Sequence, residues 1–163
     1  MKNMGFDIVV IGSGVIGHSI AYRLKQEDPQ LRVAVLGDPV NSLQASRAAA
    51  GMLAPFCECK VADPFFDFCR ESLNMFPVFL EKLTSVSEVP VYFSQAGSLM
   101  PSSSFPDTWD ERKKFFKSES ILHEIWDGNK IKEKVPFLSK ECGEIMWVGE
   151  GQVNNRQLHD SLM

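Results

Sequence analysis

Two hydrophobic patterns follow each other at the start of the chain. Residues 6–11 form a short apolar run rich in β-branched side chains, which is typical of a parallel strand buried on both faces. Apolar residues then recur at helical spacing over 16–24, and Asp28 with Pro29 ends this pattern. A second apolar run occupies 33–36. The order strand, helix, strand predicts one βαβ unit and an α/β fold class.

The middle of the chain carries a long amphipathic stripe and then a turn signal. Apolar side chains recur along one helical face over 64–83. We expect Pro77 to kink or split this helix, because proline removes a backbone hydrogen bond. Turn-forming residues at 94–97 separate two short apolar runs, so we expect a β-hairpin with strands over 89–93 and 97–100.

The last third of the chain predicts a mixture of short helices and strands. Asp107, with Asp110 three residues later, is placed like a helix N-cap box, and helical spacing follows from Trp109 to Phe116. The remaining expected elements are a helix over 129–134, a strand over 144–148 and a helix over 155–162.

Composition and charge narrow the class of protein. Apolar residues make up 44% and charged residues 23% of the 163 positions, as in an ordinary globular domain. Seventeen Lys and Arg stand against 21 Asp and Glu with no basic cluster, so nucleic-acid binding is not expected. The four cysteines form no CxxC pair and lack a companion histidine cluster, which indicates free thiols and no metal site.

No targeting or membrane segment is expected from the sequence. Asp7 interrupts the apolar run that follows Lys2, and no small-residue cleavage site closes that run. No stretch reaches the roughly 18 consecutive apolar residues of a membrane span. The sequence therefore predicts a cytoplasmic protein without a membrane span.

Three glycines connect the first predicted strand to the first predicted helix. In a G-x-G-x-x-G turn the first glycine permits a tight bend, the second lets the backbone approach a pyrophosphate, and the third lets helix and strand pack closely. The N-terminus of the helix favours a negatively charged ligand. This pattern predicts a nucleotide site, and a βαβ unit without a ligand is the alternative. Its candidate residues are Gly12, Gly14, Val15, Ile16 and Gly17.

A carboxylate at the end of the second strand is the expected partner of a ribose. A carboxylate can accept two hydrogen bonds from neighbouring hydroxyl groups. Asp38, which follows Gly37, lies at about the right distance from the first glycine. The alternative is a turn aspartate in front of Pro39.

A run of small residues covers 45–55. Small side chains let the backbone approach a flat ring or a pyrophosphate, and Ser46 is placed to cap a short helix whose dipole faces the phosphate. The alternative is the start of an ordinary alanine-rich helix. The candidate cofactor residues of this run are Ser46, Arg47, Ala48, Ala49, Ala50, Gly51 and Met52.

The histidines carry no recognisable catalytic pattern. His18, His123 and His159 are scattered along the chain, and none has a Ser, Cys or carboxylate at a suggestive spacing. A catalytic triad is therefore not expected.

Several of these motifs together resemble a known family. The glycine turn, the Ser-x-Ala-Ala-Ala-Gly-Met loop at 46–52, Glu58 and the aromatic segment 63–68 resemble the flavin-dependent D-amino-acid oxidase superfamily, most closely its glycine oxidase branch linked to thiamine biosynthesis. The resemblance implies an incomplete Rossmann-like FAD-binding domain over 1–86 and part of a mixed α+β substrate domain over 87–163. It also implies FAD as cofactor and oxidation of an amine to an imine, with oxygen as the electron acceptor.

The resemblance implies roles by position. The three glycines would take the pyrophosphate of FAD, residues 46–51 would lie along the phosphate and the flavin, and Met52 would lie near the substrate. The family usually has an acidic residue at the end of the second strand, where this chain has Gly37. Asp38 is therefore an imperfect substitute for the ribose contact.

The resemblance covers all 163 residues but only about the first half of a family member. In the family, the second half supplies the arginine and tyrosine that hold the substrate carboxylate, so no catalytic residue is assigned here. The expected function is FAD-dependent oxidative deamination of glycine or a small D-amino acid or amine. One alternative is an inactive truncated subunit, or one completed by a second chain that supplies the C-terminal half. Another is an NAD-dependent dehydrogenase, because the glycine turn alone does not separate NAD from FAD.

Overall fold

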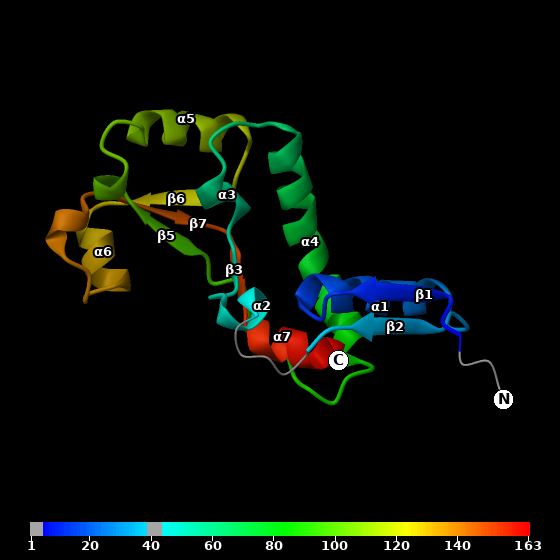
Figure 1. Ribbon diagram of the computed structural model, residues 1–163. Helices are drawn as coiled ribbons and strands as arrows, with labels where there is room; N and C mark the ends of the chain where they lie inside the picture. The colour runs from blue at the N-terminus through cyan, green and yellow to red at the C-terminus, as the bar shows by residue number, and fades with distance from the viewer. Residues whose placement is uncertain (1–4, 39–43) are drawn as a thin grey trace. The chain divides into compact units, whose positions relative to one another are not determined.

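The computed structural model describes residues 5–38 and 44–163 (Figure 1). The chain divides into two compact units, each assembled from separate stretches of sequence. The first unit contains Met1–Gly51, Val78–Tyr92 and Val153–Met163, and the second contains Met52–Pro77 and Phe93–Gln152. The domains expected from the resemblance, 1–86 and 87–163, are each contiguous, and their boundary stays a prediction.

The first unit contains a two-stranded parallel sheet. β1 (Ile8–Ile11) and β2 (Val33–Leu36) pair in register along their whole length. α1 (Val15–Glu27) connects them and ends directly before Asp28, as expected. This arrangement confirms the predicted βαβ unit, although β1 begins two residues later than the apolar run. The predicted burial of this strand on both faces is wrong, because Val9 is 49% and Ile11 is 88% exposed.

Two short helices complete the description of the first unit. α2 (Ala45–Ala48) follows β2, and α7 (Asn155–Leu162) comes from the far end of the sequence. α7 begins at the predicted residue, where the side chain of Asn154 accepts a hydrogen bond from the N–H of Gln157. α7 contacts both α1 and α2, so residues distant in sequence meet beside the glycine turn.

α4 (Pro64–Thr84) is a long helix that runs through Pro77 without interruption. The predicted split at Pro77 is therefore wrong. The boundary between the two units nevertheless falls directly after this proline. Buried apolar residues on both sides of it, Leu73 before and Leu80 and Leu83 after, maintain one packed helical face and offset the backbone hydrogen bond that proline lacks.

An antiparallel sheet with the order β5-β7-β6 forms the centre of the second unit. Its strands are β5 (Ser98–Pro101), β6 (His123–Trp126) and β7 (Ile145–Val148). Met146 on the central strand lies opposite Met100 on one side and Ile125 on the other. Both methionines belong to a core that also contains the fully buried rings of Phe66 and Phe116.

The hairpin expected around residues 94–97 does not form. β4 (Phe93–Ser94) belongs to a small sheet with the order β3-β8-β4, whereas β5 pairs with β7 in the other sheet. The other strands of the small sheet are β3 (Met52–Leu53) and β8 (Gly151–Val153). The connection between β4 and β5 is hydrogen-bonded to β7: the indole N–H of Trp147 donates to the carbonyl oxygen of Ala96 at 2.8 Å. Residues 95–97 connect the two sheets instead of closing a hairpin.

Short helices surround the larger sheet. These helices are α3 (Pro55–Glu58), η1 (Ser102–Ser104), α5 (Trp109–Ser118), α6 (Gly128–Lys134) and η2 (Lys140–Cys142). The N-cap of α5 is Thr108 and makes no side-chain cap bond, so the cap predicted at Asp107 is wrong. Asp127 caps α6 by accepting hydrogen bonds from the N–H groups of Asn129 and Lys130.

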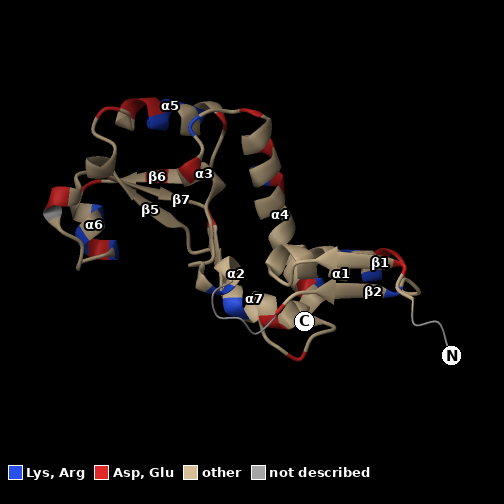
Figure 2. Cartoon of the chain, viewed as in Figure 1, with Lys and Arg blue, Asp and Glu red and all other residues tan. Residues whose placement is uncertain are grey.

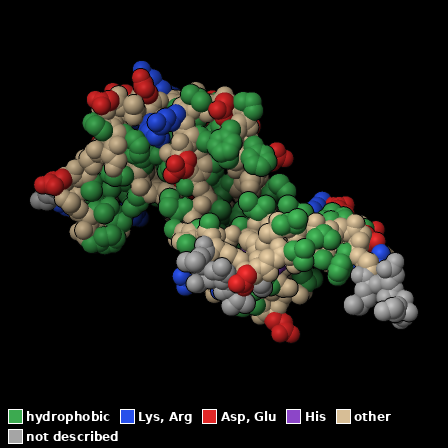
Figure 3. Space-filling view, viewed as in Figure 1, with side chains coloured by type: hydrophobic (Ala, Val, Ile, Leu, Met, Phe, Trp, Pro, Cys, Tyr) green, Lys and Arg blue, Asp and Glu red, His purple; other side chains and the backbone are tan. Residues whose placement is uncertain are grey.

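The described surface mixes charges of both signs with exposed apolar groups. Acidic and basic residues lie side by side on α5 and α6 (Figure 2). Lys113 forms an ion pair with Asp110 at 2.7 Å. Hydrophobic side chains are visible on this face of both units (Figure 3). Within the described ranges, no helix is both long and apolar enough to cross a membrane.

Candidate functional site

The glycine turn joins β1 to α1 in a conformation that side chains would obstruct. Gly12 has a φ of +112°, a value that L-residues rarely adopt. A Cβ at Gly17 would collide with the carbonyl group of Gly12, whose carbon would be only 3.0 Å away. The N–H of Gly12 donates to the carbonyl oxygen of Leu36 at 2.7 Å, so the pairing of β1 with β2 continues to the start of the turn.

The loop of small residues at 46–52, the small-residue loop, contacts the glycine turn at 12–17 through Ser46. The N–H of Val15, the first residue of α1, donates to Ser46 Oγ at 3.0 Å. A Cβ at Gly14 would lie 3.2 Å from the same oxygen. Ser46 lies inside α2, whose N-cap is Gln44, so the prediction that Ser46 caps its own helix is wrong. It instead accepts a hydrogen bond from a first-turn amide of α1.

The end of β2 explains why Gly37 stands where the family usually has an acid. A Cβ at Gly37 would lie 2.7 Å from the backbone nitrogen of Ser13 and 2.8 Å from its Cβ. Ser13 is buried, so a carboxylate at position 37 has no room. Gln44 Nε2 donates to Ser13 Oγ at 3.1 Å and also to the carbonyl oxygen of Asp38. Asp38 therefore follows β2 directly, with its backbone fastened to the loop.

The second half of the loop runs from Ala48 to Met52. Ala48, Ala49 and Ala50 are exposed. Gly51 has a φ of +78°, and its carbonyl oxygen accepts a hydrogen bond from the N–H of Val153 at 2.9 Å. Met52 begins β3 in the second unit and is exposed. The sequence-predicted residues from Gly12 to Gly51 thus lie in the first unit, and Met52 belongs to the second.

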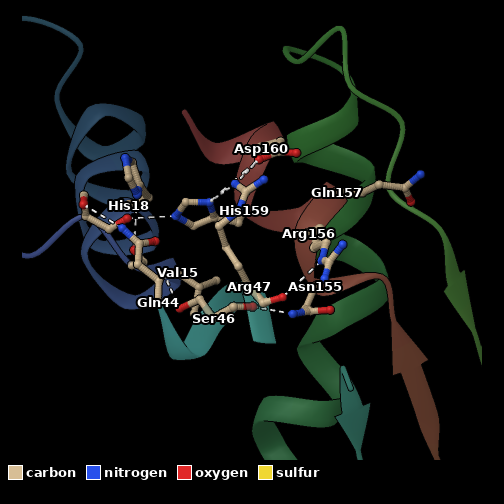
Figure 4. A network of polar contacts seen from close by, with 12 residues as sticks. Val15, His18, Gln44, Ser46, Arg47, Asn155, Arg156, Gln157, His159 and Asp160 are labelled. Carbon is tan, nitrogen blue, oxygen red and sulfur yellow. Dashed lines mark hydrogen bonds and ion pairs between the residues drawn. The ribbon is translucent and has the colours of Figure 1, made fainter. Parts of the chain in front are cut away.

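A buried histidine of α7 contacts both the glycine turn and the small-residue loop (Figure 4). His159 is fully buried, and its Nε2 lies 2.8 Å from the carbonyl oxygen of Ser13 in the glycine turn. Its Nδ1 lies 3.3 Å from Nη1 of Arg47 in the small-residue loop. The same guanidinium nitrogen forms an ion pair with Asp160 at 2.6 Å. The guanidinium group of Arg47 is therefore directed toward α7.

Two more side chains of α7 hold the backbone of the small-residue loop. Asn155 Nδ2 donates to the carbonyl oxygen of Ser46, and Arg156 Nε donates to that of Arg47 at 3.1 Å. Asn155, Arg156, His159 and Asp160 are related by helical spacing of three and four residues, which places them on neighbouring parts of one face. Four side chains of α7 thus contact the predicted cofactor loops.

This network was not predicted from the sequence. The rings of His18 and His159 meet edge to face with centroids 5.1 Å apart, although they come from opposite ends of the chain. The polar residues at i and i+4 in α7 were a usable sign that this face meets a polar partner. No local signal identified the glycine turn as that partner, because only the tertiary fold brings the two segments together.

An apolar pocket lies in the second unit, between β3, α3 and α4. Its volume is about 360 Å³, and Glu58 is the only charged residue in its lining. Phe65 and Phe68 line it and are largely exposed. The pocket begins at Met52, the last residue of the predicted cofactor loop. Such a surface is suited to apolar groups.

A buried carboxylate supports the wall of this pocket. Glu150 is 2% exposed, and its Oε1 accepts hydrogen bonds from the N–H groups of Phe56 at 2.6 Å and Cys57 at 2.9 Å. Burial and the neighbouring Glu150 carboxylate raise the pKa of the Cys57 thiol far above its usual value. Arg112 Nη1 donates to the carbonyl oxygen of Cys57 at 3.1 Å. Glu150 and Arg112 together fix the first turn of α3.

Comparison with known proteins identifies the family. Residues 7–163 match the family DAO, described as FAD dependent oxidoreductase. The bifunctional protein ThiO/ThiG of Synechocystis sp. is 32% identical over 158 residues, which are 96% of this chain and 22% of that protein. Glycine oxidase of Bacillus subtilis is 36% identical over 86 residues, which are 53% of this chain and 23% of that protein.

Solved structures agree with this assignment at the level of the fold. The crystal structure of glycine oxidase from Geobacillus kaustophilus superposes with a TM-score of 0.86 at 24% identity, over 96% of this chain and 43% of that one. The chain therefore spans less than half the length of these relatives. Its α/β fold is the N-terminal portion of the glycine oxidase fold, as the sequence predicted. The chain belongs to the DAO family of FAD-dependent oxidoreductases.

Proposed function

We propose that the first unit binds the pyrophosphate of FAD at the N-terminus of α1, and that the protein takes part in the oxidation of glycine or another small amino acid. The observation that carries this proposal is the meeting of the two predicted cofactor loops, with Val15 N–H and Ser46 Oγ 3.0 Å apart. FAD, when bound, supplies the two-electron acceptor that such an oxidation needs. Membership of the DAO family supports FAD rather than NAD, and the names of the relatives support an amino-acid substrate.

The residues at the start of α1 fit a pyrophosphate. Gly12 and Gly14 place no side chain in front of the helix, where a Cβ at position 14 would press on Ser46. The first intrahelical bond is donated by His18 to Gly14 at 3.1 Å, so the preceding amides of Ile16 and Gly17 are the donors that we assign to phosphate oxygens. Ser46 accepts from Val15 and keeps its hydroxyl hydrogen as a further donor.

The rest of the cofactor is assigned to the two segments that flank this turn. We assign the ribose to Asp38, whose backbone is fixed by Gln44 at the end of β2. We assign the flavin to Ala48–Gly51, where exposed small residues allow a flat ring to approach the backbone. Met52, the first residue of the apolar pocket, is assigned to the substrate side.

The substitution Gly14→Val tests the cofactor site. The added methyl groups would crowd Ser46 Oγ and the approach to the first turn of α1, so we expect FAD affinity to fall by at least about a hundredfold, as for a blocked backbone approach. Binding is measured by quenching of flavin fluorescence, and folding by circular dichroism. Gly5→Val is the matched control, because a Cβ there has nothing within 4 Å.

Two outcomes would contradict this proposal. A folded Gly14→Val variant with unchanged FAD affinity would remove the pyrophosphate site from the start of α1. A wild-type chain that binds NAD more tightly than FAD would favour the dehydrogenase alternative. Anaerobic bleaching of the bound flavin by glycine then tests substrate oxidation separately, and its absence would leave the chain as a cofactor-binding part without activity of its own.

A further inference from the structure

We propose that His159 and the face of α7 around it position the two cofactor loops, and that this helix thereby sets cofactor affinity; the part of the proposal that concerns affinity rests on the proposed function. The carbonyl oxygen of Ser13 in the glycine turn and the guanidinium group of Arg47 in the small-residue loop meet on one imidazole. A single buried side chain thus bridges the two segments that the sequence analysis treated as separate motifs.

The hydrogen-bond partners of His159 indicate its tautomer. The carbonyl oxygen of Ser13 can only accept a hydrogen bond, so Nε2 must carry a hydrogen. Arg47 Nη1 can only donate, so Nδ1 must offer a lone pair. These two contacts assign the hydrogen to Nε2 and the lone pair to Nδ1 of the His159 ring. In this form it acts as donor to one loop and acceptor from the other, which an apolar side chain of the same size cannot do.

The contacts around His159 reach the backbone of α2 directly. Asn155 donates to the carbonyl oxygen of Ser46, and Arg156 donates to that of Arg47. The Arg47–Asp160 ion pair is only partly exposed, at 26% and 34% of the side-chain surfaces, which limits its screening by solvent. Ser46 in turn accepts a hydrogen bond from Val15. A chain of direct hydrogen bonds thus leads from α7 to the first turn of α1.

A structural role alone predicts a different result from a positioning role. If His159 only fills the core, its effect follows the volume that it occupies. If His159 positions the loops, the effect of a substitution depends on whether the new side chain keeps a hydrogen-bond donor and an acceptor. His159→Phe keeps a ring and loses both functions, whereas His159→Gln keeps one donor and one acceptor.

The first experiment measures the dissociation constant of FAD for both variants. We expect His159→Phe to weaken binding by about tenfold or more, because the buried carbonyl oxygen of Ser13 loses this donor and Arg47 keeps only Asp160 of its two partners beside the pyrophosphate site. His159→Gln should recover most of this loss. Equal weakening by both variants, at equal thermal stability, would overturn the positioning role.

The matched control is Gln157→Ala on the same helix. Gln157 Oε1 accepts a hydrogen bond from the N–H of Tyr92 at 2.8 Å and lies outside the contacts to both loops. We expect this variant to lower the melting temperature while leaving the FAD dissociation constant within about twofold of wild type. A loss of affinity equal to that of His159→Phe would mean that α7 acts only through general stability.

A second experiment separates this proposal from the proposed function. Amide hydrogen exchange in the absence of cofactor reports on the loops themselves. We expect faster exchange at Val15 and Arg47 in His159→Phe than in wild type or His159→Gln, with unchanged exchange in β7. If wild type fails to bind FAD, the proposed function falls, and exchange still decides whether His159 holds the loops. Unchanged exchange at both residues would refute the positioning role.

Discussion

At the scale of single residues, the structure gives physical reasons why glycine occupies positions 17 and 37. The tight contact between Gly17 and the carbonyl group of Gly12 makes the third glycine of the turn a steric requirement. Gly37 is explained in the same way by the backbone of Ser13. The first could be predicted, because the G-x-G-x-x-G pattern carries a known packing reason. The second could not, because it depends on Ser13 being buried against the end of β2.

Glu150 and Cys57 provide a test at this scale. Because the buried carboxylate disfavours the thiolate, Glu150→Gln should lower the pKa of Cys57 toward its usual value and leave the part due to burial in place. More thiolate is then present at pH 8, so we expect alkylation of Cys57 by iodoacetamide to become faster. Peptide mass spectrometry after timed labelling measures the rate.

Cys142 is the internal control for this labelling, because it lies in η2, away from α3. Its rate should be the same in both proteins. In urea, Cys57 should react equally fast in wild type and variant. Unchanged labelling of Cys57 in a folded Glu150→Gln variant would show that burial alone suppresses the thiolate.

At the scale of elements, hydrophobic periodicity predicted helices and strands better than the proline and turn-forming residues predicted their boundaries. β2 and α7 occupy the expected residues, and α1 ends where Asp28 and Pro29 predicted. The sequence predicted a break in the helix at Pro77, because proline removes one local backbone hydrogen bond. The helix continues because the apolar face of α4 extends on both sides of Pro77. The turn-forming residues at 94–97 are also a local signal. They do not show that the next strand, β5, pairs with β7. Local signals therefore located the turns but not their partners.

Pro77 yields a prediction for α4. Alanine at this position restores a backbone donor in a helix interior, where proline costs about 3 kcal/mol relative to alanine in an exposed helix. Pro77 is exposed, so Pro77→Ala removes little packing. We expect the free energy of unfolding to increase by about 1–3 kcal/mol, measured by urea denaturation.

Val78→Ala is the neighbouring control for this substitution. Val78 is exposed on the same helix, so a change toward alanine should alter stability by only a few tenths of a kcal/mol. A Pro77→Ala variant less stable than wild type would mean that the helix requires the geometry that proline imposes.

At the scale of the whole molecule, the described surface carries apolar groups that an isolated globular domain rarely exposes together. Phe65 and Phe68 border the apolar pocket of the second unit, and Ile11 and Ile16 lie beside the glycine turn of the first. The net charge of −4 opposes association only weakly. The cytoplasmic location and the small-molecule substrate were inferred from composition and resemblance, and both stay predictions.

These exposed groups predict reversible self-association. Raising the ionic strength to about 1 M shortens the Debye length to about 3 Å, so charge repulsion weakens while apolar contacts persist. We expect sedimentation velocity to show larger species under these conditions, and Phe65→Ser with Phe68→Ser to reduce them. Phe137→Ser, at another largely exposed phenylalanine, is the control. A monomer at all concentrations and salt levels would contradict this expectation.

The hydrogen bond between Gly51 and Val153 has a consequence for insertions and deletions. Directly beyond it, Met52 pairs with Gln152 and Leu53 with Gly151, so the chain leaves the first unit and returns to it along one antiparallel ribbon. Adding or removing one residue in either strand would turn every side chain beyond that point in the strand to the opposite face. It would also displace Gly51, whose positive φ and close approach to the carbonyl group of Val153 leave no room for a side chain. We therefore expect natural length variation among relatives to avoid 49–53 and 151–155.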